Sequence, residues 1–158
     1  MSISIQNITE NDLASVINMM RDFAEYEKLS EYCTITEQRL HRAMFGKMGF
    51  VDGLIASDGD VPIAYALFYP SFSSFRGECG IYLEDIYILA EYRRHNIGEK
   101  LLREIARTAK SRGLERIDFQ VLDWNEPAVK FYLKHGAERN DDESHFKFSG
   151  SAFEKLAS

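Results

Sequence analysis

The most constraining feature of the 158-residue chain is an apolar segment followed by a short polar turn and then an amphipathic pattern. Residues 81–89 are apolar on both alternating faces except at Glu84 and Asp85, which is typical of a central strand covered on both sides. After the turn at 92–98, apolar residues recur at helical spacing until Gly113, which predicts a helix stop. Free backbone N–H groups and the positive dipole end at such a helix start suit a diphosphate.

The segments on either side of this unit complete a mixed α/β pattern. Alternation of apolar and polar residues predicts further strands at 2–8, 50–57, 61–69, 117–121, 137–140 and 145–148. Helical periodicity predicts three more helices, which Thr9 (paired with Asp12), Thr36 and Asn125 cap. Residues 70–80 are predicted to be a loop. The order predicts one domain over 1–158, a mixed, mostly antiparallel sheet flanked by helices.

Composition narrows the class of protein. The hydrophobic content of 45% excludes a disordered chain, and the net charge of −6 argues against nucleic acid while suiting a cationic partner. No signal-like start or membrane-length apolar run is present, so we expect a soluble cytoplasmic protein without a membrane partner. Cys33 and Cys79 lack any metal-ligand spacing, so we expect free thiols, no metal and no cysteine nucleophile.

Two segments resemble the GNAT superfamily of acetyltransferases. The turn Arg93–Gly98 resembles the Arg/Gln-x-x-Gly-x-Gly/Ala loop with which that family holds the pyrophosphate of acetyl-CoA. The run WNEPAVKFY at 124–132, followed by His-Gly-Ala at 135–137, resembles the second half of the same site. Together with Trp-Asn-Glu-Pro, the motif Tyr-Leu-Glu-Asp at 82–85 resembles the spermidine/spermine (diamine) branch, which includes enzymes that act on thialysine. The resemblance implies the GNAT acyl-CoA N-acyltransferase fold.

The resemblance implies that acetyl-CoA binds along the central strand, the turn and the start of the later helix. The residues so assigned are Ile86, Tyr87, Ile88, Arg93, Arg94, His95, Asn96, Ile97, Gly98, Glu99, Asn125, Pro127 and Ala128. Asn96 replaces the first loop glycine, and asparagine is the non-glycine residue that best tolerates left-handed backbone. Glu99 would repel a diphosphate, so we expect its side chain to point toward solvent.

Basic side chains near these segments are candidates to neutralise the CoA phosphates. They are Arg93, Arg94, Lys100, Arg103, Lys130 and Lys134. Taken singly, each is more often a solvated surface charge.

Acetyl transfer to an amine requires a proton acceptor, because an amine with a pKa near ~10.4 is an ammonium at neutral pH. The departing thiolate also needs a proton donor. The resemblance assigns these roles to Glu84 and Tyr132. Adjacent strand residues face opposite sides, so Glu84 and Asp85 enter one cleft only if a bulge re-aims one of them, as happens in the family. The alternatives are an ion pair with a nearby Arg or Lys for the carboxylates, and a core position for Tyr132.

The substrate is the least determined part of the prediction. Glu25, Glu27 and Glu31 crowd the end of the first predicted helix, which suits a diamine or polyamine, although a solvated acidic helix face has the same pattern. The resemblance places Tyr26 and Glu27, with Glu84 and Asp85, against the amine.

The sequence therefore predicts an acetyl-CoA-dependent N-acetyltransferase that works by direct attack of a neutral amine. The expected acceptor is a diamine, polyamine or thialysine-like molecule, and the resemblance implies a homodimer. Acetylation of a protein or peptide amine, or of another small amine such as an aminoglycoside, remains open. So does a non-catalytic acyl-CoA sensor that has kept the cofactor cradle.

Overall fold

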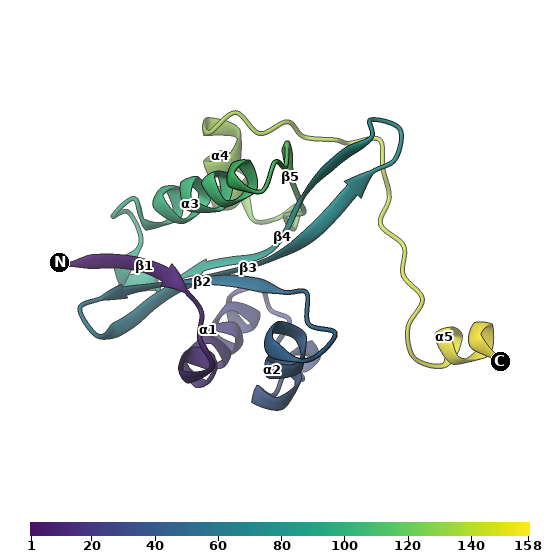
Figure 1. Ribbon diagram of the computed structural model, residues 1–158, viewed down its shortest axis with the longest axis horizontal. Helices are drawn as coiled ribbons and strands as arrows, with labels where there is room; N and C mark the ends of the chain where they lie inside the picture. The colour runs from purple at the N-terminus through teal and green to yellow at the C-terminus, as the bar shows by residue number, and fades with distance from the viewer. The chain divides into compact units, whose positions relative to one another are not determined.

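The computed structural model describes residues 1–158, and a five-stranded sheet in the order β1-β2-β3-β4-β5 organises it (Figure 1). The strands are β1 Ile3–Asn7, β2 Asp52–Asp58, β3 Val61–Ser73, β4 Glu78–Ile88 and β5 Arg116–Phe119. Strands β1 to β4 pair in antiparallel fashion, whereas β5 runs parallel to β4. The predicted fold class, a mixed and mostly antiparallel sheet with helices, is confirmed.

Five helices accompany the strands, with short 3-10 turns at 10–12, 30–32 and 90–92. They are α1 Leu13–Tyr26, α2 Glu37–Phe45, α3 Ile97–Ser111, α4 Glu126–Lys134 and α5 Gly150–Ala157. The first two helix starts are capped as the sequence predicts. The N–H and hydroxyl groups of Thr9 each donate to Asp12 Oδ2 at 2.8 Å, and Thr36 Oγ1 accepts the Arg39 N–H at 3.2 Å.

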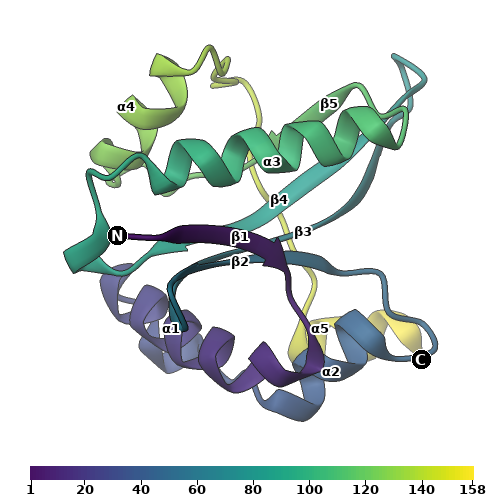
Figure 2. The ribbon, with the colours of Figure 1, turned by 60° about the vertical axis from the view of Figure 1, so that its left-hand side comes forward.

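The chain divides into two compact units, residues 1–120 and 121–158. In the first unit, α1 and α2 cover one face of the sheet and α3 covers the other (Figure 2). The second unit contains α4 and α5. A single domain over 1–158 stays a prediction. No helix combines the length and hydrophobicity needed to cross a membrane.

Hydrophobic packing fixes the first unit on both sides of the sheet. Under α1 and α2, the core includes Val16, Ile17, Leu40, Ile55, Tyr65 and Leu67. On the other side, α3 buries Ile97, Leu101, Ile105 and Ala109, one stripe at helical spacing. Each fully buried aliphatic side chain contributes about 1.5–3 kcal/mol, so the sheet that carries the site is held rigidly from both faces.

Two predicted segments differ from the structure. Residues 70–80 are not a loop, because β3 continues to Ser73 and pairs with β4 from Glu78 onward. Pro70 is tolerated there because β2 pairs with β3 only as far as Phe68, so Pro70 has an open side.

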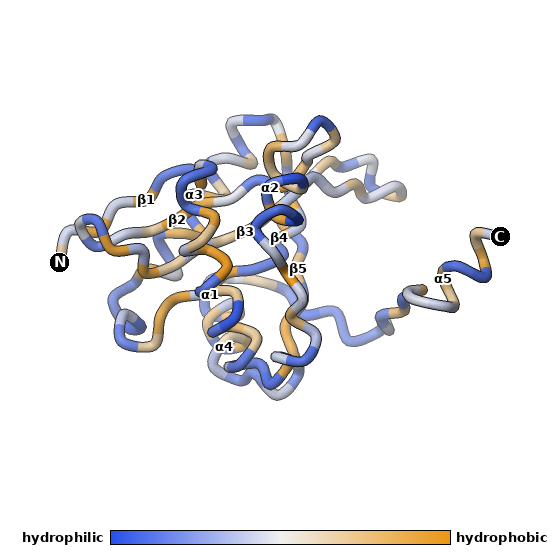
Figure 3. The backbone as a smooth tube through the Cα atoms, turned by 90° about the horizontal axis from the view of Figure 1, so that it is seen from below, coloured by the Kyte–Doolittle hydropathy of each residue, from blue (hydrophilic) through white to orange (hydrophobic).

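The predicted strands at 137–140 and 145–148 are absent, and the helix α5 that follows was not predicted. The prediction was wrong because a strand needs a pairing partner as well as alternation, and no strand pairs with these residues. Phe146 and Phe148 are accordingly exposed. Helix α5 mixes hydrophilic and hydrophobic residues over its short length (Figure 3).

Candidate functional site

A β-bulge interrupts the pairing of β3 and β4 at the two carboxylates of the central strand. Leu67 lies opposite Asp85 and the next residue, Phe68, lies opposite Leu83, so Glu84 is the extra residue of β4. Such an insertion re-aims neighbouring side chains that would otherwise point to opposite faces. The bulge expected from the resemblance is therefore present, and it is centred on Glu84.

Two tyrosines of β3 hold the carboxylates from either side of the bulge. The Tyr65 hydroxyl donates to Asp85 Oδ2 at 2.9 Å, and the Tyr69 hydroxyl donates to Glu84 Oε2 at 2.9 Å. Tyr65 and Tyr69 are four residues apart on one strand and so project from the same face, the one covered by α1 and α2. Both carboxylates therefore gather on that face. Tyr65 and Tyr69 belong to no motif of the family resemblance, although their four-residue spacing on an apolar strand predicts that they share a face.

The carboxylates lie in an acidic, partly buried environment. Burial, followed by the nearby charges of Glu84 and Glu27, raises the pKa of Asp85 to about 6, while the Tyr65 hydrogen bond acts in the opposite direction. Burial also raises the pKa of Glu27, the residue that follows α1. No lysine or arginine forms an ion pair with Asp85 or Glu84, so the alternative of structural ion pairs is not realised.

An aromatic wall adjoins the exposed carboxylate. Tyr69 stacks on Tyr82 with ring centroids 5.3 Å apart, and Phe50 meets Tyr69 edge-on at 5.7 Å. Burial raises the pKa of Tyr69 and of Tyr82, and Glu84 adds to both effects. Burial also holds the pKa of Tyr65 well above its ordinary value. The phenols therefore remain hydrogen-bond donors throughout the neutral range.

One edge of β4 is unpaired beyond the bulge. Strand β5 pairs only with residues 80–83, so the backbone from Glu84 to Ile88 lacks a partner on that side. Ile86, Tyr87 and Ile88, which the sequence analysis assigned to the cofactor, all lie on this edge. The Tyr87 side chain instead packs into the core against Phe23, with ring centroids 5.2 Å apart. Only backbone groups of Tyr87 are therefore available along the edge.

The turn that leads into α3 has the backbone shape that the sequence predicts. Asn96 is the N-cap residue with a left-handed φ of 59°, and Arg94 has a φ of 68°. The Asn96 side chain makes no capping hydrogen bond. The N–H groups of Ile97 and Gly98 therefore begin the helix without an intrahelical partner or a cap. These groups fit a diphosphate, and with the unpaired β4 edge they fit an elongated acyl-CoA.

Arg93 joins the turn to the rest of the first unit. Its Nε donates to the carbonyl oxygen of Ile88 at 3.1 Å, and its guanidinium lies 4.8 Å from the ring centroid of Tyr26 and 5.6 Å from that of Tyr87. The cation–π contacts and the hydrogen bond engage its charge with protein groups. Tyr26, assigned to the substrate from the resemblance, thus contacts this arginine at the end of α1.

The other charges around the turn divide into paired and unpaired groups. Arg103 lies 2.8 Å from Glu99 across one helical turn, so an ion pair neutralises the Glu99 charge. Arg94 and Lys100 are exposed and form no ion pair. His95 is also exposed, with Nδ1 3.1 Å from the Tyr92 carbonyl oxygen. Arg94 and Lys100 are therefore the cations of the turn that remain available to phosphates.

Helix α4, in the second unit, carries the other predicted residues. Asn125 is the buried N-cap residue, but its side chain makes no capping hydrogen bond, so the predicted cap is wrong in that detail. Pro127 lies in the first turn, and Ala128 follows it. Tyr132 is buried. Lys130 pairs with Glu126 at 2.7 Å and is thereby engaged.

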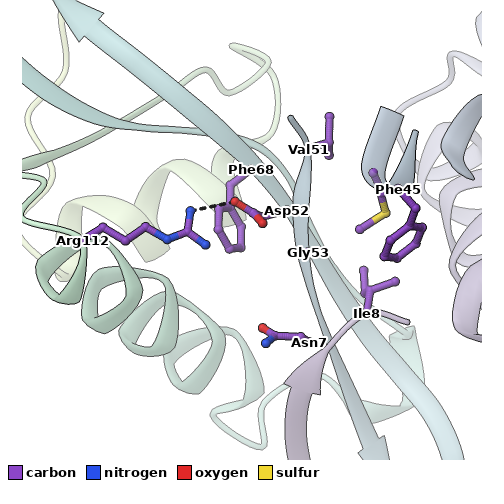
Figure 4. Close-up of a pocket in the computed structure, with 9 residues that line it drawn as sticks. Asn7, Ile8, Phe45, Val51, Asp52, Gly53, Phe68 and Arg112 are labelled. Atoms are coloured by element: carbon purple, nitrogen blue, oxygen red, sulfur yellow. Dashed lines mark hydrogen bonds and ion pairs between the residues drawn. The ribbon is translucent and has the colours of Figure 1, made fainter. Parts of the chain in front are cut away.

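Two cavities in the first unit are lined by residues other than the carboxylates of the bulge. One of about 290 Å³ is lined by Arg21, Asp22, Glu25, Ser30 and Cys33. The other, of about 170 Å³, lies beside Gly53, where Arg112 bonds Asp52 at 2.7 Å (Figure 4). Neither includes Glu27, Glu84 or Asp85 in its lining. Of the three glutamates near α1, only Glu27 shares the environment of Asp85, and Glu31 is exposed.

Residues 13–137 match the model of the acetyltransferase (GNAT) family. The chain belongs to the GNAT acetyltransferase family. It is therefore an N-acetyltransferase by family, and the family implies acetyl-CoA as the acetyl donor.

Similar proteins span almost the whole chain. The thialysine N-epsilon-acetyltransferase of Bos taurus is 34% identical over 166 residues, covering 98% of this chain and 97% of that protein. The one of Sus scrofa is 36% identical over 168 residues, covering 99% and 98%. A solved integron cassette protein from the mobile metagenome of V. cholerae has a TM-score of 0.82 at 22% identity, covering 99% of this chain and 98% of that chain. At that identity, the likeness concerns the fold.

Proposed function

We propose that this N-acetyltransferase uses acetyl-CoA to acetylate a primary amine of a small cationic molecule, such as a diamine, a polyamine or a thialysine-like compound. The observation that carries the proposal is the bulge of β4, which brings Glu84 and Asp85 to one face of the sheet without any protein cation to neutralise them. Glu27 adds a third carboxylate. An ammonium group supplies the missing positive charge, and the thialysine acetyltransferases among the relatives act on such an amine.

Acetyl-CoA supplies an acetyl group activated as a thioester. The N–H groups of Ile97 and Gly98 and the cations Arg94 and Lys100 would hold its phosphates, and the unpaired backbone of 86–88 would hold its chain. His95, Asn96, Asn125, Pro127 and Ala128 keep the cofactor-binding assignment that the resemblance implies. Arg93 supports the turn through its bond to Ile88.

The chain supplies the proton acceptor and donor for the reaction. A carboxylate at the bulge takes a proton from the ammonium, a role that the resemblance assigns to Glu84. Tyr132 keeps the implied role of proton donor to the departing thiol. Tyr26, Glu27 and Asp85 contribute to binding of the amine. The resemblance also implies a homodimer, which sedimentation velocity would test against the monomer mass of 18.2 kDa.

The decisive experiment measures CoA thiol release from acetyl-CoA with a panel of amines. The panel contains putrescine, spermidine, thialysine, ornithine, an aminoglycoside and a lysine peptide. We expect release with diamines, polyamines or thialysine and little with the peptide. Preference for the peptide or the aminoglycoside would redirect the acceptor assignment. Tight acetyl-CoA binding without release for any amine would instead indicate a sensor.

The variant Tyr132→Phe tests the chemistry, because it removes one hydroxyl and keeps the ring. One general-acid role contributes ~10²–10⁴-fold, so turnover should fall by that factor while acetyl-CoA still binds. A wild-type rate in Tyr132→Phe would remove this tyrosine from the mechanism.

A further inference from the structure

We infer that Asp85, held by Tyr65, is the carboxylate that accepts the proton of the substrate ammonium, and that its neighbour Glu84 only binds the amine. The inference rests on the proposed N-acetyltransferase function and names the residue roles within that site. It differs from the family resemblance, which assigns proton removal to Glu84. Under this inference, Asp85 is a catalytic residue and Tyr65 is the residue that positions it.

The bulge places Asp85 and Glu84 in different environments. Asp85 returns to register opposite Leu67, in the part of the strand that packs on the helix-covered core. Glu84 is the extra residue and is exposed. Water solvates an exposed carboxylate and stabilises its charge, whereas an enclosed one gains more from accepting a proton. The bulge thus separates a sheltered acceptor from a solvated binding group.

Each carboxylate accepts one tyrosine hydrogen bond, but the donor to Asp85 is buried and the donor to Glu84 is not. Tyr65 has no exposed surface, and its hydroxyl occupies Asp85 Oδ2 at 2.9 Å. Asp85 Oδ1 accepts no hydrogen bond from the protein, which leaves one oxygen for the substrate. Tyr69 bonds Glu84 at the same distance, but it lies nearer the surface. The half-buried Asp85 therefore has one oxygen fixed by Tyr65 and a second oxygen without a protein donor, the arrangement that a general base requires.

The charged groups around Asp85 all favour uptake of a proton. Glu84 faces it from the same strand and Glu27 from the end of α1, while Cys33, on the segment after α1, faces Tyr65. Burial together with the two glutamates gives Asp85 a pKa of about 6, and the Tyr65 hydroxyl counteracts part of this increase. Asp85 is thus ionised at neutral pH yet more basic than an ordinary aspartate, as a general base requires.

The proton step balances without a further reactant. An N–H bond of the ammonium breaks, an O–H bond forms on Asp85, and the electron pair stays on nitrogen. That pair attacks the thioester carbonyl carbon, and the C–S bond then breaks. The second nitrogen proton leaves as the amide forms, and the thiolate gains a proton to become a thiol. Asp85 afterwards releases its proton to solvent, so one proton is released for each amide formed from an ammonium.

The test compares two matched tyrosine variants, Tyr65→Phe and Tyr69→Phe, each of which removes one hydroxyl from one carboxylate. The measurement is kcat/KM for the best amine of the panel as a function of pH. The wild type should lose activity as the pH falls through about 6. In Tyr65→Phe this inflection should move upward by about one pH unit, because the bond that favoured the ionised carboxylate is lost. In Tyr69→Phe it should stay in place.

Two carboxylate variants complete the kinetic test. Asp85→Asn should lower kcat by ~10²–10⁴-fold. Glu84→Gln should mainly raise KM for the amine, and its acid inflection should remain but move downward, because the Glu84 charge no longer raises the pKa of Asp85. If the inflection moves in Tyr69→Phe and not in Tyr65→Phe, Glu84 is the proton acceptor and the inference is overturned. If no amine supports turnover, both the proposed function and the role of Asp85 as proton acceptor are disproved. If the enzyme turns over and its acid inflection does not move in Tyr65→Phe, the role of Asp85 as proton acceptor is disproved while the proposed function stands.

A readout independent of turnover follows the carboxyl carbon of Asp85 by ¹³C NMR in the free protein. Its titration midpoint should lie near 6 and should rise in Tyr65→Phe but not in Tyr69→Phe. A midpoint that does not respond to Tyr65→Phe would overturn the positioning role. Thermal unfolding of both variants serves as the folding control.

Discussion

At the scale of single residues, the ionised form of Asp85 is expected to lower the free energy of unfolding. Its pKa rises from an ordinary value of 3.8 to about 6 in the native state, mainly through burial. Between these values the native state binds more protons than the unfolded state, so the free energy of unfolding falls as the pH rises through this window. By pH 7 the loss amounts to up to about 3 kcal/mol, since one pKa unit corresponds to about 1.4 kcal/mol.

The variant Asp85→Asn should therefore be more stable than the wild type at pH 7, by about 1–3 kcal/mol, and nearly equal to it at pH 4. Asparagine can still accept the Tyr65 hydrogen bond, so the packing is retained. Urea unfolding at both pH values measures the difference. Glu84→Gln is the matched control and should change little, because Glu84 is exposed. Lower stability of Asp85→Asn at pH 7 would show that the ionised carboxylate stabilises the fold.

Asn96 allows a second prediction at this scale. Its φ of 59° is accessible to glycine without strain, and its side chain makes no capping bond. Asn96→Gly should thus keep acetyl-CoA affinity within about threefold or tighten it, as measured by isothermal titration calorimetry. A large loss of affinity would mean that the Asn96 side chain itself contacts the ligand.

At the scale of elements, the turn between β4 and α3 contains two adjacent arginines with different environments. Arg93 bonds the Ile88 carbonyl and lies over two tyrosine rings, whereas Arg94 is exposed and unpaired. Arg93→Ala should lower the free energy of unfolding by about 1–2 kcal/mol and change acetyl-CoA affinity little. Arg94→Ala should weaken acetyl-CoA in a salt-dependent way and leave stability within about 0.5 kcal/mol.

Chemical denaturation and calorimetric titration of the two arginine variants measure both quantities in parallel. Because the two positions are neighbours in one turn, each variant is the control for the other. Affinity lost in Arg93→Ala with stability unchanged would assign Arg93 to the phosphates instead.

Features that depend on neighbouring residues in the sequence, such as helix caps, were predictable. Features that depend on pairing with a strand far away in the sequence were not. Capping by Thr9 and Thr36 and the left-handed Asn96 follow from neighbours within a few residues. The extension of β3 past Pro70 and the absence of a strand at 145–148 depend on which strand lies alongside. Alternation alone does not contain that information.

At the scale of the whole molecule, the acidic site is assembled from residues far apart in the sequence. Glu27 follows α1, Tyr65 and Tyr69 lie on β3, and Glu84 and Asp85 lie on β4. The resemblance pointed to the three acids, because they fall in or near recognisable motifs. It did not point to the tyrosines, whose role emerges only once the strand register and the bulge are known.

Charge at this scale leads to the last prediction. The net charge is −6, and Glu27, Glu84 and Asp85 lie together without a protein cation. Such a field attracts a multiply charged amine more strongly than a singly charged one, and salt screens each charge, with a Debye length of about 10 Å at 0.1 M. Raising the salt concentration should therefore increase KM for spermidine much more than KM for a monoamine.

Steady-state kinetics from about 0.05 to 0.5 M NaCl would measure this difference, with KM for acetyl-CoA followed in the same experiments. Glu27→Gln should weaken spermidine severalfold and reduce its salt dependence while changing acetyl-CoA little, because the substitution removes one charge beside Asp85 and leaves the α3 turn intact. Equal salt responses for the two amines, or no preference for diamines over simple amines, would disprove steering by this acidic cluster. The acceptor would then have to be a singly charged amine, recognised by shape and by the aromatic wall of Tyr69 and Tyr82.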